Sequence, residues 1–100
     1  MAKIINISDK LSKDKPKIMV GESVYVVDDS MDVVLQFEEL ATTATSESML
    51  KAIEISMGKE AVEELDIKHM SISNFRVITT AILAAMQDLT YEDAEARFPK

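Results

Sequence analysis

The segment from Ser71 to Leu89 constrains the fold of this chain more than any other stretch. One set of its residues recurs at helical spacing and marks an apolar face: Phe75, Ile78, Thr79, Ile82, Met86 and Leu89. Val77, Ala81, Leu83, Ala84 and Ala85 fill much of the remaining circumference, so we expect this helix to be buried on several sides. Its apolar run is about half the roughly 20 residues that a membrane span requires. The segment therefore predicts a central core helix at about residues 72–89, capped by Ser71 or Ser73, and no membrane span.

A β-hairpin is predicted over residues 17–27. The β-branched runs Lys17–Val20 and Val24–Val27 flank Gly21-Glu22-Ser23, which is typical of two strands joined by a three-residue loop. Two strands alone are marginally stable in water. We therefore expect the hairpin to pack on the helices, to pair with a short strand at Ile4–Ile7, or to pair with another subunit.

The remainder, residues 30–98, is predicted to be helical. Ser30 and Thr90 are expected to cap two of its helices, and Gly58 is expected to end another in a left-handed conformation. Besides the central helix, the periodicity predicts helices from Ser30 to about Ala44 and over Glu47–Met57, Lys59–Leu65 and Tyr91–Phe98. We predict one domain, 1–100, of the α+β, mainly α class: an N-terminal β-hairpin or small sheet followed by a compact bundle of four to five helices, with residues 1–17 as an arm.

Charge is distributed unevenly along the chain. Residues 1–17 carry five lysines and two aspartates, a net charge of +3, whereas residues 18–100 carry six basic and sixteen acidic groups, a net charge of −10. An acidic body repels the phosphate backbone, so we expect no nucleic-acid binding. The basic arm is either a solvated tail or a contact for an acidic partner. The start, MAKIINISDK, lacks the apolar region of a signal peptide, which predicts a cytoplasmic protein.

The sequence offers little for catalysis. There is no cysteine, and His69 is the single histidine, with no cluster of metal ligands around it. The chain has two glycines and no glycine-rich phosphate loop. We expect no enzymatic activity, no metal and no cofactor, and we interpret His69 as a loop residue ahead of the central helix.

Ser30 allows a second interpretation. The tripeptide Asp29-Ser30-Met31, opening a helix in a small acidic protein, resembles the Asp-Ser-Leu/Met site of acyl carrier proteins, in which the serine carries a phosphopantetheine arm. That family has a helix before the serine, whereas here the preceding residues predict a hairpin. Ser30 is therefore interpreted first as a helix cap, with a carrier protein modified on Ser30 as the alternative; an unrelated small helical adaptor is a third reading.

The part of the chain from Ile67 to Phe98 carries a broader resemblance. Four segments follow one another in a recognisable order. They are an acidic helix at Ala61–Leu65, a serine-containing segment at Met70–Ser73 that leads into the next helix, an alanine-rich apolar helix at Ile78–Met86, and a short acidic helix ending in Arg-Phe at Tyr91–Phe98. This order is similar to that of the tail assembly chaperones of long-tailed bacteriophages, particularly those of Gram-positive hosts. The hairpin before an Asp-Ser helix start also fits that family.

The resemblance implies a function. Such chaperones coat the tape-measure protein during tail morphogenesis, keep it soluble and help to recruit tail-tube subunits. A minority long form arises by ribosomal frameshifting, and this chain would be the short form. The resemblance thus implies two partners, the tape-measure protein and the tail-tube protein, a location in the host cytoplasm and absence from the mature virion.

The expected contact surfaces are the hairpin edge and exposed apolar positions of the first and last helices. Unpaired strand edges are ready to bind other chains, and exposed apolar faces tend to be covered. We also expect homo-oligomers. The candidate partner-binding residues are Lys17, Met19, Val24, Val26, Leu35 and Phe98.

Overall fold

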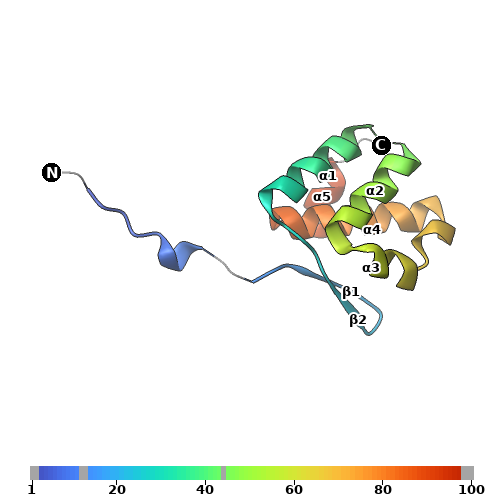
Figure 1. The fold of residues 1–100 in the computed structure, drawn as a ribbon, viewed down its shortest axis with the longest axis horizontal. Helices are drawn as coiled ribbons and strands as arrows, with labels where there is room; N and C mark the ends of the chain where they lie inside the picture. The colour runs from blue at the N-terminus through green and yellow to red at the C-terminus, as the bar shows by residue number, and fades with distance from the viewer. Residues whose placement is uncertain (1–2, 12–13, 44, 98–100) are drawn as a thin grey trace.

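A computed structural model describes residues 3–11, 14–43 and 45–97. These residues form a two-stranded antiparallel sheet followed by five α-helices, which confirms the predicted α+β, mainly α fold (Figure 1). The elements in chain order are η1 (Ser8–Lys10), β1 (Lys17–Val20), β2 (Ser23–Val26), α1 (Met31–Thr43), α2 (Ser46–Met57), α3 (Lys59–Glu64), η2 (Ile67–His69), α4 (Ile72–Gln87) and α5 (Tyr91–Arg97).

The hairpin has a shorter loop than the sequence suggested. Val20 pairs with Ser23, so the loop consists of Gly21 and Glu22 alone and the second strand begins one residue early. Gly21 has a φ of 61° at the first loop position, where two-residue hairpin loops of type II′ require glycine. Because side chains alternate between the faces of a strand, this register decides which residues of the hairpin are exposed.

The hairpin packs on the helices of its own chain, the first of the three expected arrangements. Ile18 and Val20 are half-buried against the core, and β1 contacts α4. Val27 follows the second strand and is fully buried, and the backbone N–H of Asp28 donates to the carbonyl of Ser56 at the end of α2 at 2.9 Å. The residues around Ile4–Ile7 form no strand, so the described sheet has two strands.

The helices form two layers, with the α1–α2 pair lying over α4 and α5 (Figure 1). Phe37 of α1, Ile53 of α2 and Ile82 of α4 are fully buried where the layers meet. At the edge, the Gln87 side chain donates to Glu38 at 2.7 Å and accepts from Arg97 at 2.7 Å, which links α4 to α1 and to α5.

Two predicted side-chain caps are confirmed, whereas Ser30 directly precedes α1 but its hydroxyl donates to Asp32 instead of accepting from a helix N–H. Ser71 caps α4 by accepting from the N–H of Asn74, and Thr90 accepts from the N–H of Asp93 at the start of α5. Thr45, which the sequence analysis left outside a helix, caps α2 through a reciprocal bond with Ser48, so that α2 begins at Ser46. Gly58 ends α2 at φ 93° and ψ 161°, a region essentially confined to glycine but not the left-handed helical one that we expected.

The prediction that the central helix is buried on several sides is only half right. The carboxyl-terminal half of α4 is enclosed, with Ile82, Leu83 and Met86 in the core. In the amino-terminal half, Ile72 and Val77 are about half exposed, at 56% and 47%. This first half of α4 lines a groove together with residues of α1, α2 and α5.

Candidate functional site

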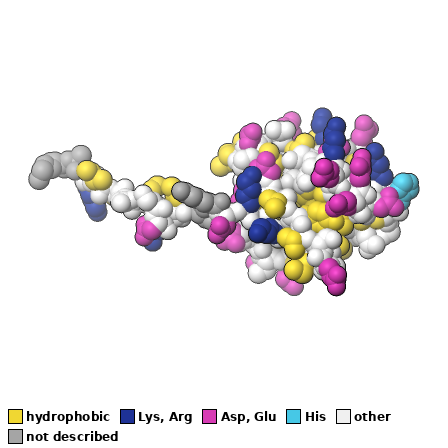
Figure 2. Space-filling view, turned by 60° about the horizontal axis from the view of Figure 1, so that its bottom comes forward, with side chains coloured by type: hydrophobic (Ala, Val, Ile, Leu, Met, Phe, Trp, Pro, Cys, Tyr) yellow, Lys and Arg dark blue, Asp and Glu magenta, His cyan; other side chains and the backbone are white. Residues whose placement is uncertain are grey.

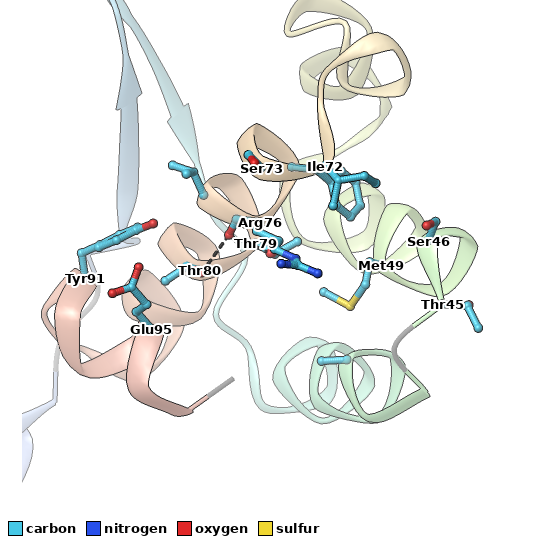
Figure 3. Close-up of a pocket in the computed structure, with 13 residues that line it drawn as sticks. Thr45, Ser46, Met49, Ile72, Ser73, Arg76, Thr79, Thr80, Tyr91 and Glu95 are labelled. Carbon is cyan, nitrogen blue, oxygen red and sulfur yellow. Dashed lines mark hydrogen bonds between the residues drawn. The ribbon is translucent and has the colours of Figure 1, made fainter. Parts of the chain in front are cut away.

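A groove of about 650 Å³ lies on the described surface. Its floor is the first half of α4, one wall is the end of α1 with the start of α2, and the other wall is α5 (Figure 3). The apolar residues that line it are Ala41, Met49, Ile72, Phe75, Val77 and Tyr91. Its size lies in the range of about 300–1,000 Å³ that is typical of ligand pockets, enough for a few apolar side chains of a partner.

Two hydroxyls of the groove floor are hydrogen-bonded within their own helix. The hydroxyls of Thr79 and Thr80 both donate to the carbonyl of Arg76, at 3.0 and 2.7 Å. Among the described residues, no buried side-chain nitrogen or oxygen lacks a hydrogen-bond partner. The floor therefore presents the apolar side chains of Ile72, Phe75 and Val77 beside these internally bonded hydroxyls and the polar residues Ser73 and Arg76.

Two charged residues of opposite sign stand at the groove. Arg76 extends from α4 into the space facing α2, and Glu95 stands with Tyr91 on α5 at the opposite wall (Figure 3). The groove lining thus carries one cation and one anion beside its apolar residues.

The four candidate residues of the hairpin lie on one face. Met19 is directly opposite Val24 in the ladder, and Lys17 is opposite Val26. All four are exposed, with Met19 at 70%, whereas the alternate residues Ile18 and Val20 point toward the core. The register therefore brings these residues together as an exposed patch of three apolar side chains and one lysine.

The other two candidate contact residues are placed differently. Leu35 lies on α1 and is 57% exposed, separate from the groove lining. Phe98 lies outside the described residues, and α5 is described as far as Arg97. The structure therefore gives a position for Leu35 and none for Phe98.

Ser30 is exposed and directly precedes α1, where its carbonyl accepts from the N–H of Val34. Its hydroxyl donates to Asp32 at 2.8 Å, and its backbone N–H donates to the Asp28 carboxylate at 3.0 Å. The backbone hydrogen bond from Ser30, with a smaller contribution from its nearby hydroxyl, lowers the pKa of Asp28 below the ordinary value of an aspartate. A strand, not a helix, leads into Ser30, so the surroundings differ from those expected for a carrier-protein serine.

His69 lies in η2 ahead of α4, exposed to solvent, with Nδ1 2.6 Å from the Asp66 carboxylate. In the part of the chain that the structure describes, no group of three or more histidine, cysteine, aspartate or glutamate side chains is arranged to hold a metal ion. None of the described helices combines the length and the apolar character that crossing a membrane requires.

Sequence reasoning missed the groove. It assigned Phe75 to the buried face and Val77 to the surrounding apolar circumference, although both line the open hollow. A signal was nevertheless present, because the first half of the segment holds Ser73, Asn74 and Arg76 among its apolar residues, whereas the second half is almost uniformly apolar. Polar residues confined to one half of a core helix indicate that only the other half is enclosed.

Comparisons with protein-family models, curated proteins and solved structures found no match to this chain.

Proposed function

We propose that this chain is the short form of a tail assembly chaperone of a long-tailed bacteriophage. In this proposal it acts without catalysis: it binds the tape-measure protein in the host cytoplasm, keeps its apolar helical surface covered and helps to recruit tail-tube subunits, which then displace it. It would accordingly be absent from the finished virion. The sequence resemblance over residues 67–98 suggests this role, and the groove on α4 supplies a physical means for it.

The observation that supports the proposal best is the set of apolar side chains that line that groove. An amphipathic helix binds by inserting apolar side chains spaced three or four residues apart into such a hollow. Met49 and Phe75 offer adaptable and flat apolar surfaces there, and a methionine side chain adjusts to partners of irregular shape. The resemblance implies a long helical client with a hydrophobic stripe, and an adaptable site suits such a client.

The charge of the body is consistent with a chaperone that works at high local concentration. Residues 18–100 have a net charge of −10, which makes the bodies of neighbouring copies repel one another. A chaperone coating one long client must place many copies side by side without precipitating. Mutual repulsion between bodies allows this while leaving the apolar groove open to the client.

Co-expression with a tape-measure protein tests the proposal. The client would come from the gene cluster in which this chain is encoded, and the measurement would be the soluble fraction of that client with and without this chain. We expect the client to be soluble only in the presence of the chain. Val77→Lys, which places a charge on the groove floor, should abolish the effect, whereas Gln36→Lys adds the same charge on an exposed position of α1 and should preserve it.

Two results would contradict the proposal. The first is a client that stays insoluble with the wild-type chain, or a gene cluster without tail genes. The second is a mass increase on Ser30 after incubation with a phosphopantetheinyl transferase, which would identify a carrier protein. A Ser30→Ala variant is the control for that measurement, since it removes the acceptor hydroxyl while α1 keeps its buried residues.

A further inference from the structure

The amino-terminal arm carries exposed apolar side chains that its own domain does not cover. Residues 3–11 lie away from the helical body (Figure 1), and the described chain measures 60 Å along its longest axis against 30 and 23 Å along the others. Ile4 is 92% exposed and Ile5 71%, and Ile7 and Leu11 are also more than half exposed. Hydrophobic side chains are visible along the arm in Figure 2. Clustered exposed apolar residues of this kind mark a surface that another molecule covers.

The groove on α4 matches the arm in chemistry. Six of its lining residues are apolar, and its volume of about 650 Å³ suits a short segment with two or three isoleucines. The segment before η1 is extended, so its side chains are free to enter a shallow hollow rather than being used in a helix or sheet of its own. The arm is thus a short apolar segment of a size that fits the open groove.

The charges match as well. The arm contains Lys3 and Lys10, and residues 1–17 have a net charge of +3, whereas the body has a net charge of −10. The groove wall on α5 carries Glu95, and Arg76 extends from the floor toward α2. By contrast, the exposed face of the hairpin carries Lys17, which repels a basic segment. The net charge of the body favours contact with the arm, and Glu95 gives the lysines of the arm a partner in the groove that the hairpin face with Lys17 does not offer.

We propose that the arm of one copy of this chain docks in the α4 groove of a second copy, with Ile4, Ile5 and Ile7 on the apolar floor and the lysines toward α5. The two surfaces in this contact are different, so each docked pair retains one free arm and one free groove. Such a head-to-tail contact extends into open chains unless the geometry closes a ring. The proposal concerns binding between copies and holds whether or not the groove also receives a tape-measure protein.

Two variants of the full chain test the proposal by sedimentation equilibrium over a range of concentrations. The arm variant replaces Ile4, Ile5 and Ile7 with serine and keeps the lysines. The groove variant is Val77→Lys, at a position that is 47% exposed. We expect the wild type to self-associate and each variant to associate at least about tenfold more weakly. Gln36→Lys, with the same added charge away from the groove, should associate as the wild type does.

The decisive measurement is a mixture of the two variants. The arm variant retains an intact groove and the groove variant retains an intact arm, so together they should form a one-to-one heterodimer that does not grow further. Circular dichroism establishes that both variants are folded; should Val77→Lys unfold, Ile72→Ser replaces it on the groove floor. Loss of binding to the client with retention of this heterodimer would refute the proposed chaperone function and leave the arm contact standing.

Several outcomes would overturn the arm contact. These are a wild type that is monomeric at all concentrations, association that survives in either variant, and a mixture that forms no heterodimer. A monomer in which the arm protects its own groove from labelling, independently of concentration, would show that docking occurs within one copy and would also overturn the proposal.

Discussion

Replacing Ile82 by alanine tests the finding that α4 is enclosed at its centre and open at its beginning. Ile82 is fully buried between the helical layers. Truncating a buried isoleucine to alanine removes its apolar contacts and leaves a cavity, and this lowers the free energy of unfolding by about 2–5 kcal/mol. For a domain whose total stability is typically about 5–15 kcal/mol, that is a large fraction. With a urea m-value of about 2 kcal/mol per molar, the unfolding midpoint should fall by about 1–2.5 M.

Val77→Ala is the matched control, because Val77 lies on the same helix and is 47% exposed. The smaller side chain loses little buried area there, and alanine has a higher helix propensity than valine by up to about 0.7 kcal/mol. We expect its free energy of unfolding to stay within about 0.5 kcal/mol of the wild type. Urea unfolding followed by circular dichroism measures both variants. Equal destabilisation by the two substitutions would refute the reasoning, since it would mean that α4 is buried at Val77 and that the groove floor is covered.

Three further predictions follow from the local geometry. Thr45→Ala removes the side-chain acceptor at the start of α2 and should lower the free energy of unfolding by about 0.5–2 kcal/mol in chemical denaturation, whereas Thr43→Ala, on an exposed position of α1, should change it less. Gly58→Ala forces an L-residue to φ 93° and ψ 161° and should lower the free energy of unfolding by about 1–3 kcal/mol in the same assay; a neutral result would contradict this backbone conformation. The carboxyl of Asp28 should titrate below an ordinary aspartate in NMR. Because its folded-state pKa is lowered, its contribution to stability is present above the unfolded-state pKa and is lost as the pH falls through the folded-state pKa, and Asp28→Asn should remove this part of the pH dependence.

Local sequence signals predicted most of the elements because they act over a few residues. The caps at Ser71 and Thr90 and the helix-ending Gly58 lie where the sequence placed them, although Gly58 adopts a different ψ. The hairpin was predicted with a loop one residue too long, because Ser23 was assigned to the turn on its residue type. Instead, Ser23 pairs with Val20 and belongs to the second strand. Strand pairing of this kind depends on tertiary packing, here of the hairpin against α4, as well as on residue type.

The candidate site was harder to predict because it depends on where helices stop covering one another. Periodicity shows that Phe75 and Val77 are on an apolar helix, but it does not show how far α5 and the α1–α2 pair extend along that helix. The exposed residues of the hairpin were easier to predict, because successive side chains of a strand point to opposite faces. Met19 therefore lies on the exposed face and its neighbour Ile18 on the face toward the core. Tertiary coverage, rather than local preference, therefore limited the prediction of the groove.

The basic arm and the acidic body differ in which charged partner can approach their exposed apolar surfaces. Two bodies of net charge −10 that approach each other through their helical faces repel, so the groove of one copy is protected from the groove of another. The arm has the opposite sign and an apolar sequence, and it can approach the same groove with a favourable field. Added salt acts on these two encounters in opposite directions: it weakens attraction between arm and body and relieves repulsion between bodies. Added salt should therefore weaken self-association through the arm. Nonspecific association through exposed apolar faces should become stronger under the same change, so the direction of the salt effect distinguishes the two.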